Sequence, residues 1–321
     1  MKLQTSISLS KQSKNQIDYH SDVLLLGSCF VENIGKKLNY FKCCSLQNPF
    51  GILFHPKAIE TLISNTINQK EYSEKDIFFH NEQWHCFDAH SKLSHTSKDH
   101  LLNELNSNIK STNGYLATAS HIIITLGTAW AYKHIEIDKA VANCHKVSQK
   151  QFNKELFSVE DVFNALKKTV DLIRSVNKTA SIIFTVSPVR HLKDGFIENT
   201  LSKAHLITAI HQFLNQESSI TNHNSHYFPS YEIMLDELRD YRFYAEDMLH
   251  PNQTAIDYIW EKFLEVWVSQ DALKTMEDVD GIQKGLQHKP FNPSSEAHSK
   301  FLQQLESKII KLQANFPRIS F

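Results

Sequence analysis

Runs of branched apolar residues alternate along this chain with segments whose apolar positions lie three or four residues apart. The first run, residues 23–26, ends at Gly27 and predicts a short strand buried on both faces. Similar runs predict four further strands, near Lys42, His121, Ser181 and His226. Strands that alternate with helices are typical of a parallel sheet with right-handed crossovers. We therefore expect an α/β fold with a sheet of five parallel strands and helices on both faces.

The helices expected between these strands carry recognisable start signals. Ser97 and Ser158 stand where a side chain can cap a helix, and Asp161 completes the capping-box spacing after Ser158. Pro56 and Pro251 suit the first turn of a helix, where a missing N–H costs nothing. We predict helices over residues 29–41, from Pro56, after Ser97, after Ser158, over residues 201–214 and from Pro251.

Two short insertions have the pattern of β-hairpins, with strand-like pieces on each side of a polar turn. The first is expected to form one wall of a site between the sheet and its connections. The predicted hairpins pair residues 77–79 with 84–87 around Asn81 and Glu82, and residues 135–137 with 140–142 around Asp138 and Lys139.

The composition turns polar after Asp271, and Pro290 and Pro293 indicate a linker before a final helix that begins near Ser294. We divide the chain into a main domain, residues 1–270, and a C-terminal linker with a helical appendage, residues 271–321. The final helix carries an apolar stripe that must be covered, either by the main domain or by a second copy in a homodimer. The stripe consists of Leu302, Leu305, Ile309 and Leu312.

Charge and apolar content exclude several classes of partner. The 321 residues have a formal net charge of -1, so no overall field favours nucleic acid or an acidic membrane surface. The first 20 residues lack a continuous apolar region, and no window reaches the roughly 18 apolar residues of a membrane span. We expect a cytoplasmic protein that binds neither nucleic acid nor membrane.

Cysteine, histidine and glycine positions give no signature of a metal or cofactor. The five cysteines form an odd set without a C-x-x-C pair, which argues against a disulfide framework and a zinc knuckle. Glycine-rich phosphate loops are missing. Histidines recur every five residues, a spacing that places neighbours on one face of neither a helix nor a strand. We therefore predict no metal and no cofactor; the histidines are His80, His85, His90, His95 and His100.

Ser28 is the candidate nucleophile. It follows the first strand directly and precedes the first helix, so its hydroxyl is expected at the carboxyl edge of the sheet, where open α/β sheets bind ligands. The alternative interpretation is that Ser28 only caps the helix. A nucleophilic serine needs a histidine base that a carboxylate orients.

Asp247 and His250 are the candidates for these two partners. Asp247 alone among the aspartates is followed three residues later by a histidine, and the pair lies in the last β-α connection. That connection is expected on the same sheet edge as Ser28. The alternative interpretation makes Asp247 a charge at the start of a helix and His250 a solvated loop residue.

Seven short motifs resemble, in order, the GSCFA family, a branch of the SGNH (GDSL-like) hydrolases, over roughly residues 1 to 270. The first motif is the one that gives the family its name. The motifs are Gly27-Ser28-Cys29-Phe30, Asn48-Pro49-Phe50-Gly51, Phe87-Asp88-Ala89-His90-Ser91, Gly127-Thr128-Ala129-Trp130, Ala142-Asn143-Cys144-His145-Lys146, Ser187-Pro188-Val189-Arg190-His191 and Asp247-Met248-Leu249-His250-Pro251.

The resemblance implies a flavodoxin-like three-layer α/β/α sandwich, the SGNH hydrolase fold, with the five strands in the order 2-1-3-4-5. It implies that Ser28 is the nucleophile, His250 the base and Asp247 its orienting partner. The oxyanion hole of these hydrolases combines the N–H of the serine, here Ser28, with a glycine N–H, here Gly51, and an asparagine side chain. No asparagine follows Gly127, so Thr128, or Asn143 on the predicted hairpin, would have to substitute.

We predict a serine esterase that removes a small acyl group, acetyl above all, from a carbohydrate or another polar substrate. The loops expected around Ser28 carry polar residues and no long apolar groove of the kind a lipase needs. Two alternatives remain: a non-catalytic ligand-binding module with the same fold, and an acyltransferase. The residues expected to bind substrate are Asn48, His90, Trp130, His145, Arg190 and His191.

Overall fold

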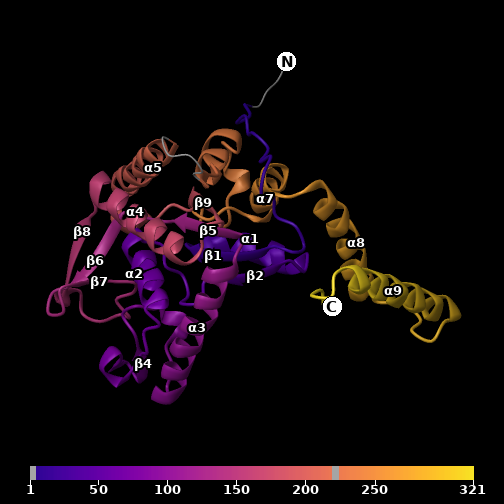
Figure 1. Cartoon of the computed structure of the whole chain (residues 1–321), viewed down its shortest axis with the longest axis horizontal. Helices are drawn as coiled ribbons and strands as arrows, with labels where there is room; N and C mark the ends of the chain where they lie inside the picture. The colour runs from indigo at the N-terminus through magenta and orange to yellow at the C-terminus, as the bar shows by residue number, and fades with distance from the viewer. Residues whose placement is uncertain (1–4, 219–223) are drawn as a thin grey trace.

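A five-stranded parallel sheet forms the centre of the molecule (Figure 1). The computed structural model describes residues 5–218 and 224–321. Across the sheet the strands follow the order β2-β1-β5-β9-β10, and every neighbouring pair is parallel, which confirms the predicted order 2-1-3-4-5. This is the flavodoxin-like, doubly wound arrangement. The strands are β1 (Asp22–Gly27), β2 (Cys44–Gln47), β5 (His121–Leu126), β9 (Ser181–Val186) and β10 (Ser225–Tyr227).

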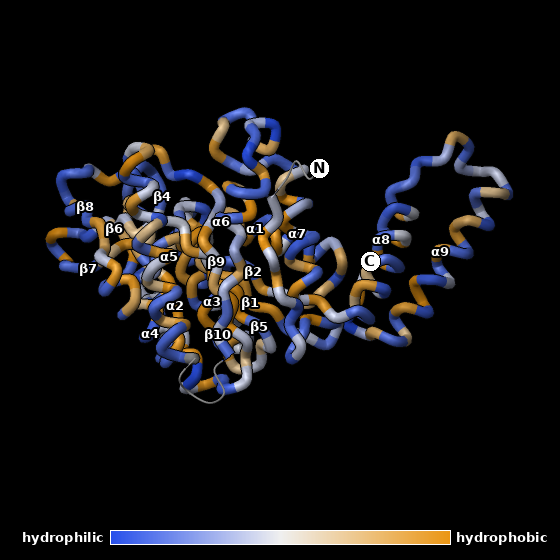
Figure 2. The backbone as a smooth tube through the Cα atoms, turned by 90° about the horizontal axis from the view of Figure 1, so that it is seen from above, coloured by the Kyte–Doolittle hydropathy of each residue, from blue (hydrophilic) through white to orange (hydrophobic). Residues whose placement is uncertain are grey.

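Helices cover both faces of the sheet and complete three layers. Successive residues of β1 point to opposite faces, so Leu24 packs into a core with α2 to α5, whereas Leu25 packs into a second core with α1, α7 and α8. Figure 2 shows apolar stretches gathered in the middle of the main body. The helices are α1 (Cys29–Tyr40), α2 (Pro56–Ile67), α3 (Lys98–Thr118), α4 (Val159–Val176), α5 (Phe196–Ser218), α6 (Ser230–Glu232), α7 (Gln253–Trp267), α8 (Gln270–Gln287) and α9 (Glu296–Asn315).

The predicted start signals hold for three helices and fail for one. Ser97 caps α3, Ser158 forms a capping box with Asp161 at the start of α4, and Pro56 is the first residue of α2. Helix α7 instead begins at Gln253, because the side chain of Asn252 caps it by accepting from the N–H of Ala255. Pro251 lies before that cap and forms an isolated β-bridge with Tyr244.

The first inserted hairpin is present, and the second differs from its prediction. Strands β3 (Phe78–His80) and β4 (Gln83–His85) pair antiparallel as expected. In the second insertion β6 (Trp130–His134) pairs with β7 (Lys139–Val141), so Ile135 and Ile137 belong to the turn, where they are 52% and 50% exposed. A third strand, β8 (Phe152–Leu156), pairs with the other edge of β6 and was missed because most of its residues are exposed and polar.

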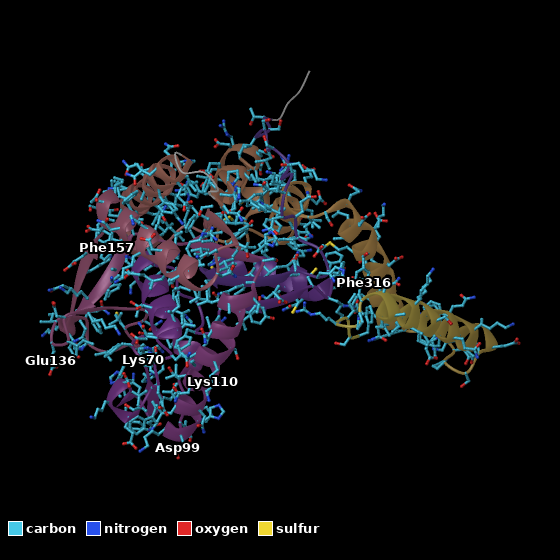
Figure 3. All side chains as sticks on the ribbon, in the orientation of Figure 1. Lys70, Asp99, Lys110, Glu136, Phe157 and Phe316 are labelled. Carbon is cyan, nitrogen blue, oxygen red and sulfur yellow. The ribbon has the colours of Figure 1, made fainter. Side chains whose placement is uncertain are left out.

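The segment predicted as a linker after Asp271 is helical. Helix α8 occupies residues 270–287, only residues 288–295 connect it to α9, and the two helices project from the main body as a C-terminal arm (Figures 1 and 2). The base of the arm is fastened by a hydrogen bond from Tyr40 to Asp280 of 2.8 Å and by an ion pair between Arg318 and Asp22. Figure 3 shows Phe316 at this base, and its ring centroid lies 5.1 Å from that of Tyr19.

The apolar stripe of α9 is covered within the chain along part of its length. Leu305 and Leu312 are each 6% exposed and pack in the same core as the buried residues of α8, such as Ile282. Leu302 and Ile310 are 47% and 61% exposed. A homodimer through this helix stays a prediction. None of the helices in residues 5–218 and 224–321 combines the length and the apolar character needed to cross a membrane.

Candidate active site

Ser28 lies at the turn between β1 and α1, at the carboxyl edge of the sheet. Gly27 reaches this turn with φ +134°, and a Cβ there would lie 2.1 Å from the carbonyl oxygen of Thr125, so glycine is required. The hydroxyl of Ser28 accepts from the N–H of Phe30 at 3.3 Å and caps the helix. The helix cap and the candidate nucleophile are therefore the same side chain in the same position. The positive end of helix α1 favours negative charge on its Oγ. Ser28 is completely buried.

Asp247 and His250 form a hydrogen-bonded pair in a tight turn before α7. Asp247 Oδ2 lies 2.6 Å from His250 Nδ1, and its Oδ1 accepts from the backbone N–H groups of Leu249 and His250, both at 2.9 Å. Those N–H groups, with the His250 ring, lower the pKa of Asp247 to about 2, so the carboxylate is ionised at neutral pH. An ionised carboxylate on Nδ1 leaves Nε2 of His250 available as a base. The two side chains are about half exposed, at 47% and 49%.

His191 connects this turn to the edge of the sheet. Its Nε2 is buried without a hydrogen-bond partner in the described part of the chain, and a Cβ built on Gly127 would lie 3.1 Å from it. Burial, then the charges of Lys203 and His250, lower the pKa of His191 to about 4. His250 is thus close to the residue that contacts the end of β5, the neighbour of β1. Ser28 and His250 share no hydrogen bond among the residues described.

The two backbone N–H groups predicted for the oxyanion hole are both engaged in backbone hydrogen bonds. The N–H of Ser28 donates to Thr125 O at 2.9 Å, and that of Gly51 donates to Asn48 O at 2.7 Å. Gly51 has φ +72°, and a Cβ there would lie 2.5 Å from the Cβ of His90. His90 therefore packs against the turn that carries Gly51, and its ring caps the short helix that follows.

Asn48 offers a donor that the predicted set did not include. Its Oδ1 accepts from the N–H of Gly27 at 2.9 Å, and its backbone N–H donates to Leu25 O at 2.8 Å. These two bonds hold the side chain beside the Gly27-Ser28 turn. The Nδ2 of Asn48 is buried and has no partner in residues 5–218 and 224–321. A buried amide without an acceptor is unfavourable, which makes it a candidate ligand-binding group.

The side chains predicted as the third oxyanion donor have other partners. Thr128 Oγ1 lies 2.9 Å from Ser202 Oγ and accepts from the N–H of Trp130 at 3.1 Å. Asn143 Oδ1 accepts from the N–H of His145 at 2.8 Å in a loop turn. The Thr128 hydroxyl thus holds the chain after β5 against α5, and Asn143 shapes the loop after β7.

A cavity of about 460 Å³ lies between the end of β5 and the sheet formed by β6, β7 and β8. Rings of Phe54 and Tyr132 form part of its wall. Among the described residues, His145 Nδ1 and His55 Nε2 are buried here without partners. Five of the predicted site residues line this cavity: Thr128, Trp130, Asn143, His145 and His191.

Arg190 lines a second cavity of about 430 Å³, next to the turn that carries His250. Met248, from the middle of that turn, lines it together with exposed aromatic rings such as Tyr241. Arg190 has no hydrogen bond or ion pair among the residues described, whereas Arg239 in the same wall pairs with Asp236. The structure thus divides the predicted substrate-binding set between two cavities, and Asn48 and His90 line neither of these two.

Sequence reasoning missed Lys203 and Ser202, which approach the sheet edge from α5. Lys203 is 1% exposed, and its Nζ donates to the carbonyl oxygens of Gly127 and Ser187 at 2.7 and 2.8 Å. Its spacing from Leu206 and Ile210 places it on the apolar face of the helix, and this was the available signal. No group of three or more side chains suited to a metal ion occurs in residues 5–218 and 224–321.

The fold and the residues at the carboxyl edge of the sheet define a class of protein. It is a doubly wound α/β protein with a serine, a histidine-aspartate pair and two cavities near the carboxyl ends of its strands. The chain belongs to the GSCFA family: residues 22–263 match that family, as the motif at Ser28 predicted, and residues 279–321 match the C-terminal domain of GSCFA domain proteins. Among solved structures it is similar to an acetyl xylan esterase from the rumen bacterium Butyrivibrio proteoclasticus, with 10% sequence identity and a TM-score of 0.39. That similarity covers 84% of this chain and 65% of the esterase chain. A comparison with curated proteins found no match.

Proposed function

We propose that this GSCFA family protein is a serine esterase that removes a small acyl group, acetyl above all, from a carbohydrate or another polar substrate. The observation that carries the proposal is the Asp247-His250 pair, joined at 2.6 Å in a turn whose Met248 lines a cavity with Arg190 from the loop after β9. A serine becomes a useful nucleophile only with such a base, and the ionised Asp247 holds His250 in the required tautomer.

The reaction follows from these three groups. His250 accepts the proton of Ser28 as Oγ bonds to the acyl carbon, and the carbonyl electron pair moves to its oxygen. The C–O bond to the alcohol then breaks, and the alcohol takes its proton from His250. Water, activated by His250, releases the acid from Ser28 in the reverse sequence. An alcohol in place of water in the last step would make the protein an acyltransferase.

We assign the stabilisation of the oxyanion to Asn48 Nδ2. This donor is buried, has no partner among the described residues and belongs to a side chain bound to Gly27, next to Ser28. A preorganised donor of this kind contributes about 3 to 4 kcal/mol to transition-state stabilisation. The cavity between β5 and β6 would bind the hydroxylated part of the substrate through Trp130 and the unpaired ring nitrogen of His145.

Covalent labelling tests the proposal directly. A fluorophosphonate probe is expected to modify Ser28 of the native protein, located by mass spectrometry of the digested adduct, and to leave Ser28→Ala unlabelled. Cys29→Ser is the matched control, because burial raises the pKa of that neighbouring thiol and so disfavours the thiolate. Cys29→Ser should keep both labelling and turnover of p-nitrophenyl acetate, and a loss of turnover there would move the nucleophile to Cys29.

The complete burial of Ser28 favours a second candidate, a ligand-binding module without catalysis. In that case the cavity residues, with Arg190 and His191, would hold a ligand that is never cleaved. The labelling experiment separates the two functions, because a folded protein without an adduct on Ser28 would reject the esterase and leave the binding module.

A further inference from the structure

Lys203 carries a buried positive charge for which no carboxylate partner exists in the described residues. The 20 salt bridges among those residues do not include it, although its side chain is 1% exposed. Its Nζ donates to two backbone carbonyl oxygens, Gly127 O at 2.7 Å and Ser187 O at 2.8 Å. An ammonium without an opposite charge is unfavourable inside a protein, so its presence at a sheet edge points to a functional role.

The two carbonyl groups belong to neighbouring strand ends at the candidate site. Gly127 follows β5 and Ser187 follows β9, and these strands pair in parallel. Gly127 is also held from its other side, because its N–H donates to Phe54 O at 2.7 Å. Ser28 is bonded to the same strand, since its N–H donates to Thr125 O. One ammonium therefore joins the chain segments that lie beside the nucleophile.

Groups from three elements face this ammonium. Cys29 lies at the start of α1, Arg190 and His191 lie in the loop after β9, and the ring centroid of Tyr231 in α6 is 5.7 Å from Nζ. Burial, against the opposing effect of Cys29 and together with the charge of Arg190, lowers the pKa of Lys203 to about 7. Burial raises the pKa of Cys29, the residue after Ser28, and the charge of Lys203 opposes that rise. Its charge therefore acts at the position where an anion would form.

We propose that Lys203 is a positioning residue of the candidate active site, which fixes the peptide groups after β5 and β9 and provides positive charge that favours the oxyanion formed at Ser28. The proposal rests on the proposed function, because it requires Ser28 to be the nucleophile. Lys203 forms no covalent bond and transfers no proton in this role. It acts only while it is an ammonium, so labelling of Ser28 should weaken as pH rises past neutrality.

The test compares Lys203→Met with Ser230→Ala in the full-length protein. Ser230 Oγ donates to Val186 O at 2.8 Å, so Ser230→Ala removes a buried hydrogen bond from the end of β9 without changing charge. The readout is the rate of Ser28 labelling by a fluorophosphonate between about pH 5.5 and 9, a range that brackets the titration of a group near neutrality. Circular dichroism verifies that each variant is folded.

We expect the rate of wild-type labelling to rise and then fall across this pH range. Lys203→Met should be labelled about 10-fold to 100-fold more slowly at about pH 6.5, the effect of losing one stabilising group. Its labelling rate should not fall at alkaline pH. Ser230→Ala should keep the wild-type profile. If Lys203→Met fails to fold, Lys203→Arg decides, because arginine stays charged and should abolish the alkaline fall.

Each remaining outcome overturns the role of Lys203, and one of them also overturns the esterase. A folded Lys203→Met with the wild-type rate and profile would reject the role of Lys203 and leave the esterase intact. An alkaline fall that persists in Lys203→Arg would reject it as well. A wild-type protein without an adduct on Ser28 would reject the esterase, and the role of Lys203 with it.

Discussion

The two halves of the candidate active site are held in different ways. Ser28 is fully buried, and its position depends on the pairing of β1 with β5, in which Gly27 pairs with Thr125. Asp247 and His250 are about half exposed, and their position depends on hydrogen bonds within one turn of four residues. The candidate nucleophile is therefore part of the folded core, whereas the candidate base belongs to a local surface structure. Substitutions in the two halves should differ in their effects on stability even where their effects on catalysis agree.

The largest expected effect is the loss of catalysis when either half is removed. Ser28→Ala and His250→Ala should each lower kcat/KM by about 10⁴-fold or more, because neither group acts without the other. Their stabilities should differ: Ser28→Ala loses the cap of α1, worth about 1 kcal/mol, whereas His250→Ala should stay within about 0.5 kcal/mol of wild type. Asp247→Asn should retain residual activity, because the backbone of the turn still orients His250 in part.

Ester hydrolysis assays combined with chemical denaturation measure both effects. Asp257→Asn, an exposed substitution away from the turn, serves as a control for surface charge. Equal losses of stability in Ser28→Ala and His250→Ala would contradict the comparison of the two halves.

The next effect concerns the unpaired amide of Asn48. Asn48→Asp keeps an oxygen for the N–H of Gly27 but removes the Nδ2 donors, whereas Asn48→Ala removes both. If Nδ2 stabilises the oxyanion, both variants should lose about 10²- to 10³-fold in kcat with KM little changed. Only Asn48→Ala should also lose stability through the unpaired Gly27 N–H. A normal kcat in either folded variant would remove Asn48 from the oxyanion hole.

Much of the fold followed from local sequence pattern. Apolar runs that end at Gly27 and Gly127 identified β1 and β5, whereas the order of the strands was predicted from the resemblance to the family. Helix α8 was missed because polar residues dominate it, although Met276, Val279 and Ile282 are spaced as one apolar face. Composition was given more weight than periodicity there.

The site was predictable only where it depends on local sequence. The spacing of Asp247 and His250, together with their position in the last β-α connection, indicated that the two side chains act as a pair, and they are hydrogen-bonded. The engagement of the Ser28 N–H with Thr125, the free amide of Asn48 and the contacts of Lys203 depend on which segments the fold brings together. No spacing within one segment encodes such contacts, so these features became visible only in the structure.

A smaller effect should appear when the acyl chain of the substrate is lengthened. Ser28 has no exposed surface, so the acyl group must fit in whatever space opens beside it. Among p-nitrophenyl esters we expect the acetate to be hydrolysed about 10-fold faster or more than the decanoate, since added methylenes have little room. Rates measured with Ser28→Ala correct for hydrolysis elsewhere on the protein. Faster hydrolysis of the decanoate would indicate a lipid substrate instead.

The last expected effect is a pH dependence of stability above neutrality, which comes from the buried Lys203. Folding lowers the pKa of Lys203 from 10.5 to about 7, so between these pH values the unfolded chain holds a proton that the folded chain has released. The free energy of unfolding due to Lys203 therefore rises with pH in this window, by at most about 1.4 kcal/mol per pH unit, and is constant below it. The free energies of unfolding of wild type and Lys203→Met are measured by guanidinium denaturation at about pH 6, 7, 8 and 9, a spacing that resolves this slope. The difference between the two proteins isolates the contribution of Lys203, because the other titrating groups contribute equally to both. Ser230→Ala should differ from wild type by the same amount at every pH, and a difference between wild type and Lys203→Met that does not change with pH would show that Lys203 titrates normally in the folded protein.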